Sequence, residues 1–175
     1  MTGALLVGGA SRRFGSPKAL ALLAGETLAE RAHRTLAEAF GTVIAVGKAE
    51  DALDLPFPVL DDGSELRAAI VGVAAALRHA ARDVVVVLPT DMPAVTPTYL
   101  RELAAALDES VAAAHPQTGP LPSAYRRSAL PILERRIAAG DLALRAAAAE
   151  LGARVVVGNP ETLRNVNTQD DLALL

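Results

Sequence analysis

The sequence predicts an α/β protein in which helices cover both faces of a mainly parallel sheet, so that the fold has three layers. Apolar runs of strand length alternate along the 175 residues with segments in which apolar residues recur at helical spacing. One run, residues 84–88, is apolar at every position, which is typical of a central strand covered on both faces. In a sheet of this kind, ligands bind at the carboxyl ends of the strands.

The first half of the chain contains three predicted strands and two predicted helices. Thr27 is followed three residues later by Glu30, and this pair forms a capping box that marks the start of a helix. A second helix is predicted from Ser64, because apolar residues recur at helical spacing from Leu66 to Leu77. The predicted strands are residues 4–9, 42–47 and 57–60, and the predicted helices are residues 27–40 and 64–77.

The second half of the chain continues the alternation and closes on a helix. Gly152 stands directly after a helical run and is a typical residue for the end of a helix. The predicted strands are residues 84–88, 110–115, 121–125 and 154–158, and the predicted helices are residues 98–107, 130–139, 142–151 and a last one from about Thr168.

Three loops lie at the carboxyl ends of predicted strands, namely residues 8–18, 61–65 and 89–93. The first loop carries three glycines, which let the backbone turn tightly and let phosphate oxygens approach the amide N–H groups. It also carries three cations that a polyphosphate would neutralise. The glycines are Gly8, Gly9 and Gly15, and the cations are Arg12, Arg13 and Lys18.

The first loop matches neither of the two common phosphate-binding motifs. A Walker A loop needs a lysine directly after its last glycine, and here Ser16 and Pro17 intervene. A dinucleotide-binding fingerprint needs a glycine where Ala10 stands. A tight strand-to-helix connection would explain the glycines alone. Together with three cations at the end of the first strand, they favour a phosphate-binding loop of a different kind.

Composition and charge limit the classes of partner. The formal net charge of −3 gives no attraction to nucleic acid or to an anionic membrane, so neither is an expected partner. The chain has no cysteine, which excludes disulfides and thiolate metal sites. No apolar stretch reaches the roughly 18 residues that a membrane helix needs. We therefore expect one cytoplasmic domain over residues 1–175.

Four segments together follow the sequence pattern of one family. Residues 6–18 read LVGGASRRFGSPK, where the family loop is LAGGxSxRMGxxK. Residues 88–93, LPTDMP, match a family segment CDMP, and residues 165–172, NVNTQDDL, match NxNTPEDL. Residues 121–145 are similar to a family stretch that runs from PLxALYRRS to GDRRLR. In these segments the chain resembles the molybdenum cofactor guanylyltransferases and their MobA-like NTP transferase relatives.

The resemblance implies a three-layer, Rossmann-like nucleotidyltransferase fold with a mainly parallel mixed sheet. It also implies a Mg²⁺-dependent enzyme that moves GMP from GTP, or a nucleoside monophosphate from another NTP, to the terminal phosphate of a molybdopterin-type cofactor and releases pyrophosphate. Such a transfer depends on positioning and charge stabilisation rather than on a nucleophilic side chain. Apo-molybdoenzymes are the expected recipients of the product.

The family motifs also imply roles for single residues. Lys18 and Arg13 would balance the charge of the triphosphate, and Asp91 would bind Mg²⁺ as the third catalytic residue. Asp62 would contact ribose or metal, although its neighbour Asp61 leaves that assignment open. The residues expected to bind the nucleotide or the acceptor are Leu6, Gly8, Gly9, Ala10, Ser11, Gly15, Asp62, Asn165 and Asn167.

Simpler roles exist for some of these residues. Asp91 stands before a Met-Pro turn, where an aspartate often caps local amides. Asn165 and Asn167 precede the last predicted helix and are equally suited to cap it.

Two departures from the family pattern fall on segments that pack near the nucleoside. Residues 65–67, ELR, stand where a GPLAGI-like family segment has glycine, proline and leucine. The asparagine often found after the second strand is missing from residues 43–48, VIAVGK. These changes affect base recognition more than phosphate chemistry. They leave open a CTP-using enzyme, an enzyme with another phosphorylated acceptor, and a catalytically weakened cofactor-binding protein of the same fold.

Overall fold

A computed structural model of the chain describes residues 1–8 and 17–174. Its centre is a seven-stranded sheet, and a small antiparallel hairpin of β2 (Leu22–Leu23) and β3 (Glu26–Thr27) lies outside that sheet. The strands of the large sheet are β1 (Thr2–Leu6), β4 (Val43–Gly47), β5 (Val59–Asp61), β6 (Val84–Pro89), β7 (Ala113–Pro116), β8 (Ser123–Arg126) and β9 (Arg154–Val156).

The large sheet is mixed but mainly parallel, as the sequence predicts. Its strand order is β5-β4-β1-β6-β8-β7-β9. The first four strands of this order run parallel, β8 is antiparallel to both of its neighbours, and β7 and β9 are parallel again. The carboxyl ends of β5, β4, β1 and β6 therefore lie side by side at one edge of the sheet.

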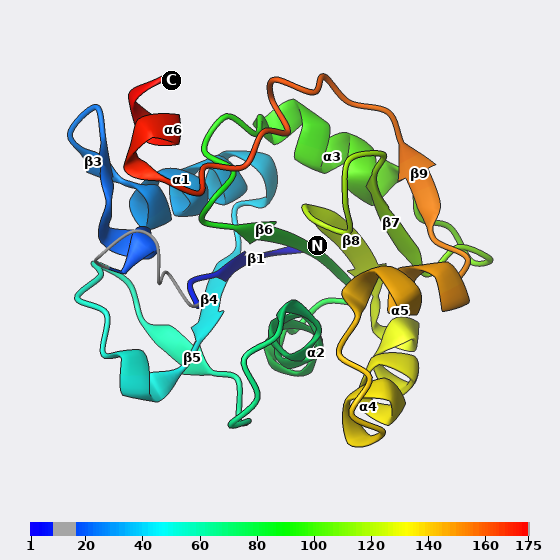
Figure 1. Ribbon diagram of the computed structural model, residues 1–175. Coiled ribbons are helices and arrows are strands. Elements are labelled where there is room, and N and C mark those ends of the chain that lie inside the picture. Colours follow the sequence, from blue (N-terminus) through cyan, green and yellow to red (C-terminus); the bar gives the residue numbers. More distant parts are fainter. Residues whose placement is uncertain (9–16, 175) are drawn as a thin grey trace.

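Helices cover both faces of the sheet and complete three layers (Figure 1). Helices α1 and α3 pack on one face, whereas α2 and α4 pack on the other, with α5 against α4. The helices are α1 (Leu28–Phe40), α2 (Ala69–His79), α3 (Pro97–Ala105), α4 (Leu130–Ala138), α5 (Leu144–Glu150) and α6 (Gln169–Ala173).

Strand β6 has the buried position that its continuous apolar run predicts. Val85 and Val87 point into the core beneath α2, and Val86 and Leu88 point into the core beneath α1 and α3. All four side chains are at most 1% exposed. Strand β6 therefore packs against the helices on both faces of the sheet. This packing fixes the position of its carboxyl end, where residues 89–93 begin.

The predicted helix starts and ends agree with the structure at most positions. The Thr27 hydroxyl accepts the N–H of Glu30 at 3.1 Å, and the Glu30 carboxylate accepts the N–H of Thr27 at 2.9 Å, which is the predicted capping box. Gly152 follows α5 with a φ of +60°, a conformation that glycine adopts readily. Within the part of the chain that the structure describes, no helix has the length and apolar character needed to cross a membrane.

Several predicted boundaries are wrong by two or more residues, including the starts of β5 (Val59 rather than residue 57), β7 (Ala113 rather than residue 110) and β8 (Ser123 rather than residue 121). Strand β1 begins at Thr2 rather than at residue 4, because Thr2 and Gly3 already pair with β6. Helix α2 begins at Ala69 rather than at Ser64, and Leu66 is 41% exposed. The carbonyls of Ser64 and Leu66 accept hydrogen bonds from a lysine side chain, so the backbone of this segment is drawn out of the helical pattern.

Candidate active site

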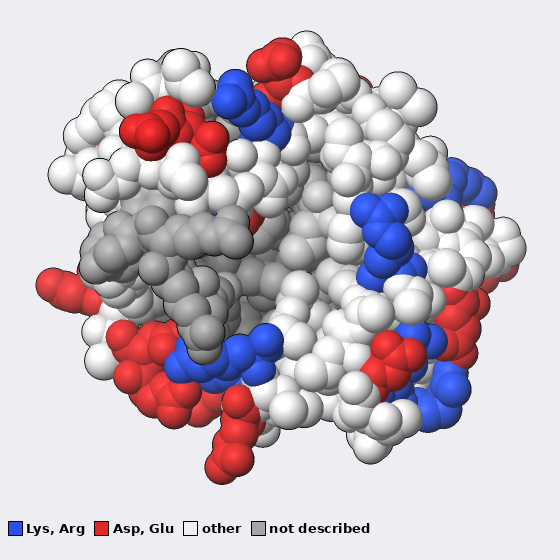
Figure 2. Space-filling model, in the orientation of Figure 1, with Lys and Arg blue, Asp and Glu red and all other residues white. Residues whose placement is uncertain are grey.

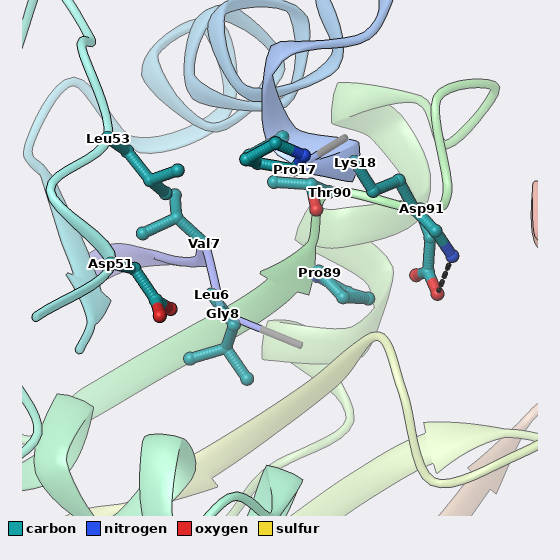
Figure 3. A pocket seen from close by; sticks show the side chains of 11 residues that line it. Leu6, Val7, Gly8, Pro17, Lys18, Asp51, Leu53, Pro89, Thr90 and Asp91 are labelled. Atoms are coloured by element: carbon teal, nitrogen blue, oxygen red, sulfur yellow. Dashed lines mark hydrogen bonds and ion pairs between the residues drawn. The ribbon is translucent and has the colours of Figure 1, made fainter. Parts of the chain in front are cut away.

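A pocket opens where β1 and β6 end and is lined from four separate parts of the chain (Figure 3). Its volume is about 470 Å³. Leu6, Gly8 and Pro89 lie between its two sides, with Lys18 and Asp91 on one side and Asp51 on the other. Two of the three strand ends selected by the sequence, those before residues 8–18 and 89–93, thus meet at this cavity.

Lys18, Asp91 and Asn167 converge beside this pocket. The Lys18 ammonium nitrogen lies 3.5 Å from Oδ2 of Asp91 and 3.3 Å from Oδ1 of Asn167. Lys18 begins a short 3₁₀ turn after the first loop, Asp91 follows β6, and Asn167 precedes α6. Residues separated by up to 149 positions along the chain therefore share one polar point.

The segment that carries Asn167 is tied to the end of β6. The N–H of Val166 donates to the carbonyl of Asp91 at 2.8 Å, and the Val166 side chain is buried while Asn165 and Asn167 on either side are exposed. The buried Val166 anchors this segment at the end of β6. On either side of it, Asn167 contacts Lys18 and Asn165 lines a second pocket.

The N-terminus of α6 also holds Asn167 in place. The Asp171 carboxylate accepts the backbone N–H of Asn167 at 2.8 Å and that of Thr168 at 2.9 Å. The Thr168 hydroxyl accepts the N–H of Asp171 in return, so the two form a capping box. The hydrogen bond from the backbone of Asn167, together with those from Thr168, lowers the pKa of Asp171.

Asp91 has one carboxylate oxygen engaged and one that is not. Oδ2 accepts from Lys18, whereas Oδ1 is buried and has no hydrogen-bond partner among residues 1–8 and 17–174. A buried carboxylate oxygen in this condition suits a hard cation, which prefers oxygen ligands. The described residues contain no cluster of three or more His, Cys, Asp or Glu that could enclose a metal ion by itself. Asp91 therefore fits a cation that a bound ligand helps to hold.

The second pocket, of about 290 Å³, lies at the ends of β1 and β4 and has a wall with few side chains. Gly8, Gly47 and Gly72 line it. A Cβ at Gly47 would lie 2.8 Å from Cγ2 of Val7, and one at Gly72 would lie 3.0 Å from Cδ2 of Leu6. Close packing against Val7 and Leu6 therefore leaves no room for a side chain at these two glycines.

A buried ion pair closes one side of the second pocket. The Lys48 ammonium nitrogen lies 2.8 Å from Oδ1 of Asp62 and 2.8 Å from the carbonyl oxygen of Leu66, and it also donates to the carbonyl of Ser64. The side chains of Lys48 and Asp62 are 6% and 8% exposed. The pair therefore ties the end of β4 to the segment that follows β5.

A more exposed set of ion pairs lies between the two pockets. Arg67 contacts Asp51 through both of its terminal nitrogens, at 2.8 and 3.2 Å, and Glu50 at 2.6 Å. Asp51 lines the first pocket and Arg67 lines the second. Among the described residues, most exposed charges lie at the rim of this face, and the surface beside the central hollow is mainly neutral (Figure 2). The described residues therefore offer a ligand local contacts here rather than a broad charged field.

The structure gathers the described members of the predicted site around the two pockets. Leu6, Gly8, Lys18 and Asp91 line the first pocket, while Asp62 and Asn165 line the second. Asn167 lines neither pocket but lies 3.3 Å from the Lys18 ammonium nitrogen beside the first one. The other predicted site residues lie outside the described residues, and they are Gly9, Ala10, Ser11, Arg13 and Gly15.

Three residues at the site were missed by the sequence prediction. Lys48, Asp51 and Arg67 all line one of the pockets. The rule that places ligands at the carboxyl ends of strands applies to residues 42–47 as well as to the other strands. Applied there, it would have selected the loop that begins at Lys48.

Comparison with known proteins relates this geometry to one family. The model of the MobA-like NTP transferase domain matches residues 3–155. The chain is 32% identical to a probable molybdenum cofactor guanylyltransferase of Aquifex aeolicus, covering 96% of this chain and 86% of the relative. It is 35% identical to the protein of the same name from Deinococcus radiodurans, with 100% and 93% covered. The crystal structure of molybdopterin-guanine dinucleotide biosynthesis protein A from Archaeoglobus fulgidus superposes with a TM-score of 0.83 at 27% identity, with 99% and 96% covered.

Proposed function

The chain belongs to the MobA-like NTP transferase family, and from this premise we propose that it transfers GMP from GTP to the terminal phosphate of a molybdopterin-type cofactor. An oxygen of the acceptor phosphate attacks the α-phosphorus of GTP and forms a new phosphoanhydride bond. The bond from the α-phosphorus to the oxygen that bridges it to the β-phosphorus breaks, and pyrophosphate leaves with that oxygen and the electron pair.

The observation that carries this proposal is the meeting of Lys18, Asp91 and Asn167 at the carboxyl end of the sheet. The reaction needs a positive group near the triphosphate, a carboxylate for a metal ion, and neutral groups that orient the acceptor. These three side chains supply the three kinds of group, with Asp91 3.5 Å and Asn167 3.3 Å from the Lys18 ammonium nitrogen. No nucleophilic side chain is required, because the acceptor phosphate is itself the nucleophile.

Asp91 is the proposed ligand of Mg²⁺. Its buried Oδ1 has no hydrogen-bond partner among the described residues, and this oxygen is the proposed ligand atom for the metal ion. Mg²⁺ is commonly held by one or two carboxylates together with substrate phosphates, so one aspartate and a triphosphate form an adequate set. When bound, the metal ion neutralises charge that builds up on the phosphate oxygens.

Lys18 is the proposed partner of the triphosphate. Its contact with Asp91, at 3.5 Å, is longer than the roughly 2.7–2.9 Å of a strong charge-assisted hydrogen bond. The contact with Asp91 is therefore a weak competitor for a phosphate oxygen of the nucleotide. We assign the triphosphate cradle to residues 8–15, whose sequence GGASRRFG carries the family pattern, with Arg13 as the second cation.

The second pocket is the proposed nucleoside site. Its glycine-lined wall suits a flat ring, and Asp62 and Asn165 offer polar groups at its edges. Asn165 and Asn167 stand on either side of the buried Val166, so one faces the nucleoside pocket while the other faces Lys18. The acceptor phosphate then lies near Asn167, between the metal ligand and the cation.

Acceptor-dependent release of pyrophosphate tests the proposal. Each of the four NTPs is supplied with Mg²⁺ and the pterin acceptor, and the product is identified by mass spectrometry. We expect turnover with GTP and a product that contains one GMP joined to the acceptor. Turnover with CTP would assign a cytidylyltransferase, turnover only with another phosphorylated acceptor would replace the cofactor, and failure of all four nucleotides would indicate a protein that binds without catalysis.

A further inference from the structure

The ammonium group of Lys48 is fully engaged inside the protein. Such a group carries three N–H donors and no acceptor. In the structure three oxygens accept from it, namely Oδ1 of Asp62 and the carbonyl oxygens of Ser64 and Leu66. With all three donors in use, Lys48 offers nothing further to a ligand. Its effect on the nucleoside pocket must pass through the segment that it holds.

Residues 62–66, the segment that Lys48 holds, also form hydrogen bonds with one another. The N–H of Ser64 donates to Oδ1 of Asp62 at 3.0 Å, and the N–H of Leu66 donates to Oγ of Ser64 at 3.1 Å. The N–H of Asp62 donates to the carbonyl of Gly47 at 2.9 Å, which joins the start of the segment to the end of β4. These hydrogen bonds are all formed in one conformation of the segment, and they therefore favour that conformation.

Ion pairing alone does not account for this arrangement. A buried ion pair is often no more stabilising than an apolar pair of similar volume, because both charges lose their hydration. An apolar side chain at position 48 could not bind the carbonyls of Ser64 and Leu66, however. Those two contacts turn the segment away from the helical path that its apolar spacing predicts, and the residues at its two ends, Asp62 and Arg67, line the second pocket.

We propose that Lys48 is a positioning residue for nucleobase selection, which fixes residues 62–66 so that Asp62, and Arg67 directly after the segment, line the second pocket where the base binds. This inference rests on the proposed function. A pocket rejects the wrong base strongly when its polar groups lie at fixed places and would be left unpaired by that base. Without the Lys48 ammonium group, residues 62–66 can change conformation and pair with a wrong base. The free-energy penalty for binding that base then falls. The effect is on the ratio of affinities between bases rather than on the phosphate site.

The test compares nucleotide affinities in the absence of the acceptor. Isothermal titration calorimetry gives Kd for GTP and for CTP, with Mg²⁺, in the wild type and in Lys48→Cys. The ratio of the two Kd values cancels any change that affects both nucleotides alike. We expect the ratio to fall roughly tenfold in Lys48→Cys, as loss of about one buried hydrogen bond implies. An unchanged ratio in a folded Lys48→Cys protein overturns the inference.

Chemical restoration separates positioning from a general loss of structure. The chain contains no cysteine, so the introduced thiol is the only one. Alkylation of unfolded Lys48→Cys with 2-bromoethylamine, followed by refolding, restores an ammonium group on a side chain of nearly the same length. The wild type, carried through the same treatment, is the control. Recovery of the wild-type ratio supports the inference, and a ratio that stays low after alkylation overturns it.

Two further variants keep the test decisive. If Lys48→Cys does not fold, Lys48→Arg replaces it, since its planar guanidinium keeps the charge but cannot meet the same three oxygens in the same directions. A lower ratio in Lys48→Arg supports the inference, and an unchanged ratio overturns it. Arg154→Met is the matched control, because Arg154 also binds a carbonyl and a carboxylate, those of Ala106 and Asp108, but at the opposite edge of the sheet. Its ratio should equal that of the wild type.

Failure of the inference and failure of the proposed function give different results. A wild type that binds GTP selectively but transfers nothing to the pterin acceptor contradicts the function and leaves Lys48 in its role. A wild type that transfers GMP but binds GTP and CTP equally contradicts the inference and leaves the function intact.

Discussion

The chain has two lysines, Lys48 directly after β4 and Lys18 in a 3₁₀ turn beside the end of β6, and each faces an aspartate, yet the two pairs differ in closeness and burial. Lys48 and Asp62 are 2.8 Å apart, with side chains 6% and 8% exposed. Lys18 and Asp91 are 3.5 Å apart, with side chains 17% and 25% exposed. The first pair is tight and shielded, whereas the second is long and open to a pocket.

This difference separates a lysine that holds the protein from one that is available to a substrate. A tight buried pair is costly to open, because each charge would be left without compensation. A long pair beside a pocket can exchange its partner for a phosphate oxygen at small cost. Under the proposed function, Lys48 thus positions the segment beside the nucleoside pocket, whereas Lys18 takes part in the phosphate chemistry.

The largest expected effect is loss of turnover in Asp91→Asn. The amide keeps the shape of the side chain but lacks the charge that Mg²⁺ prefers, so we expect no detectable pyrophosphate release and a folded protein. Turnover across a Mg²⁺ titration is the measurement, with circular dichroism for the fold. Asp83→Asn is the control, because Asp83 stands just before the other end of β6, where it pairs with Arg126. Normal turnover of Asp91→Asn at limiting Mg²⁺ would assign Asp91 to capping its turn.

The next largest effect is on stability, in Lys48→Met. Removing one partner of a buried pair leaves the Asp62 carboxylate uncompensated, which commonly costs about 3–5 kcal/mol. Urea unfolding should therefore show a much lower midpoint. The double variant Lys48→Met/Asp62→Leu should recover most of that loss, because it removes both charges. A single variant as stable as the wild type would mean that the pair opens readily, and the comparison between the two lysines would lose its basis.

Lys18→Ala should show the opposite pattern, with a large effect on rate and a small one on stability. Loss of a group that stabilises transition-state charge commonly costs about 2.7–4 kcal/mol, or roughly 10²–10³ in rate. Single-turnover kinetics with saturating GTP measure this loss, and thermal unfolding measures the stability. Arg34→Ala is the control, since Arg34 lies on α1 and forms exposed ion pairs with Glu26 of β3 and Glu38 of α1. Full activity of Lys18→Ala would remove Lys18 from the site.

The sequence predicted the layers and the strand ends because those depend on local patterns. The apolar run at residues 84–88 and the capping box at Thr27 are visible without any knowledge of distant partners. The strand-end rule then brought Lys18 and Asp91 to the same edge of the sheet, and the structure places them 3.5 Å apart.

The same patterns could not predict the role of Lys48 or the start of α2. The partners of Lys48 lie 14 to 18 residues further along the chain, and two of them are backbone carbonyls that leave no mark in a sequence. The apolar spacing from Leu66 onward is helical, but a tertiary contact holds the backbone before Ala69 in another form. Periodicity reports what a segment favours, whereas a buried charge elsewhere decided its conformation.

The smallest expected effect concerns the support of Asn167, which connects Lys18 to the C-terminal segment. The pKa of Asp171 is lowered from 3.8, first by the N–H of Asn167, so the bond contributes stability above about pH 4 and loses it as the pH falls through the lowered value. In Asp171→Asn we expect faster amide hydrogen exchange at Asn167 and Thr168 at pH 7, with global stability almost unchanged.

The difference in exchange between Asp171→Asn and the wild type should shrink as the pH falls from about 4 through the lowered pKa of Asp171, because the wild-type carboxylate then becomes protonated as well. Asp170→Asn is the matched control, since it removes a carboxylate from the same first turn of α6 and leaves the capping box in place. Turnover of Asp171→Asn should fall by less than roughly tenfold, because the carboxylate supports Asn167 through a helix cap and does not itself contact the substrate. If exchange at Asn167 does not change, then the bond from Val166 to Asp91 and the contact with Lys18 hold the segment by themselves, and the open lysine site is more rigid than its long ion pair indicates.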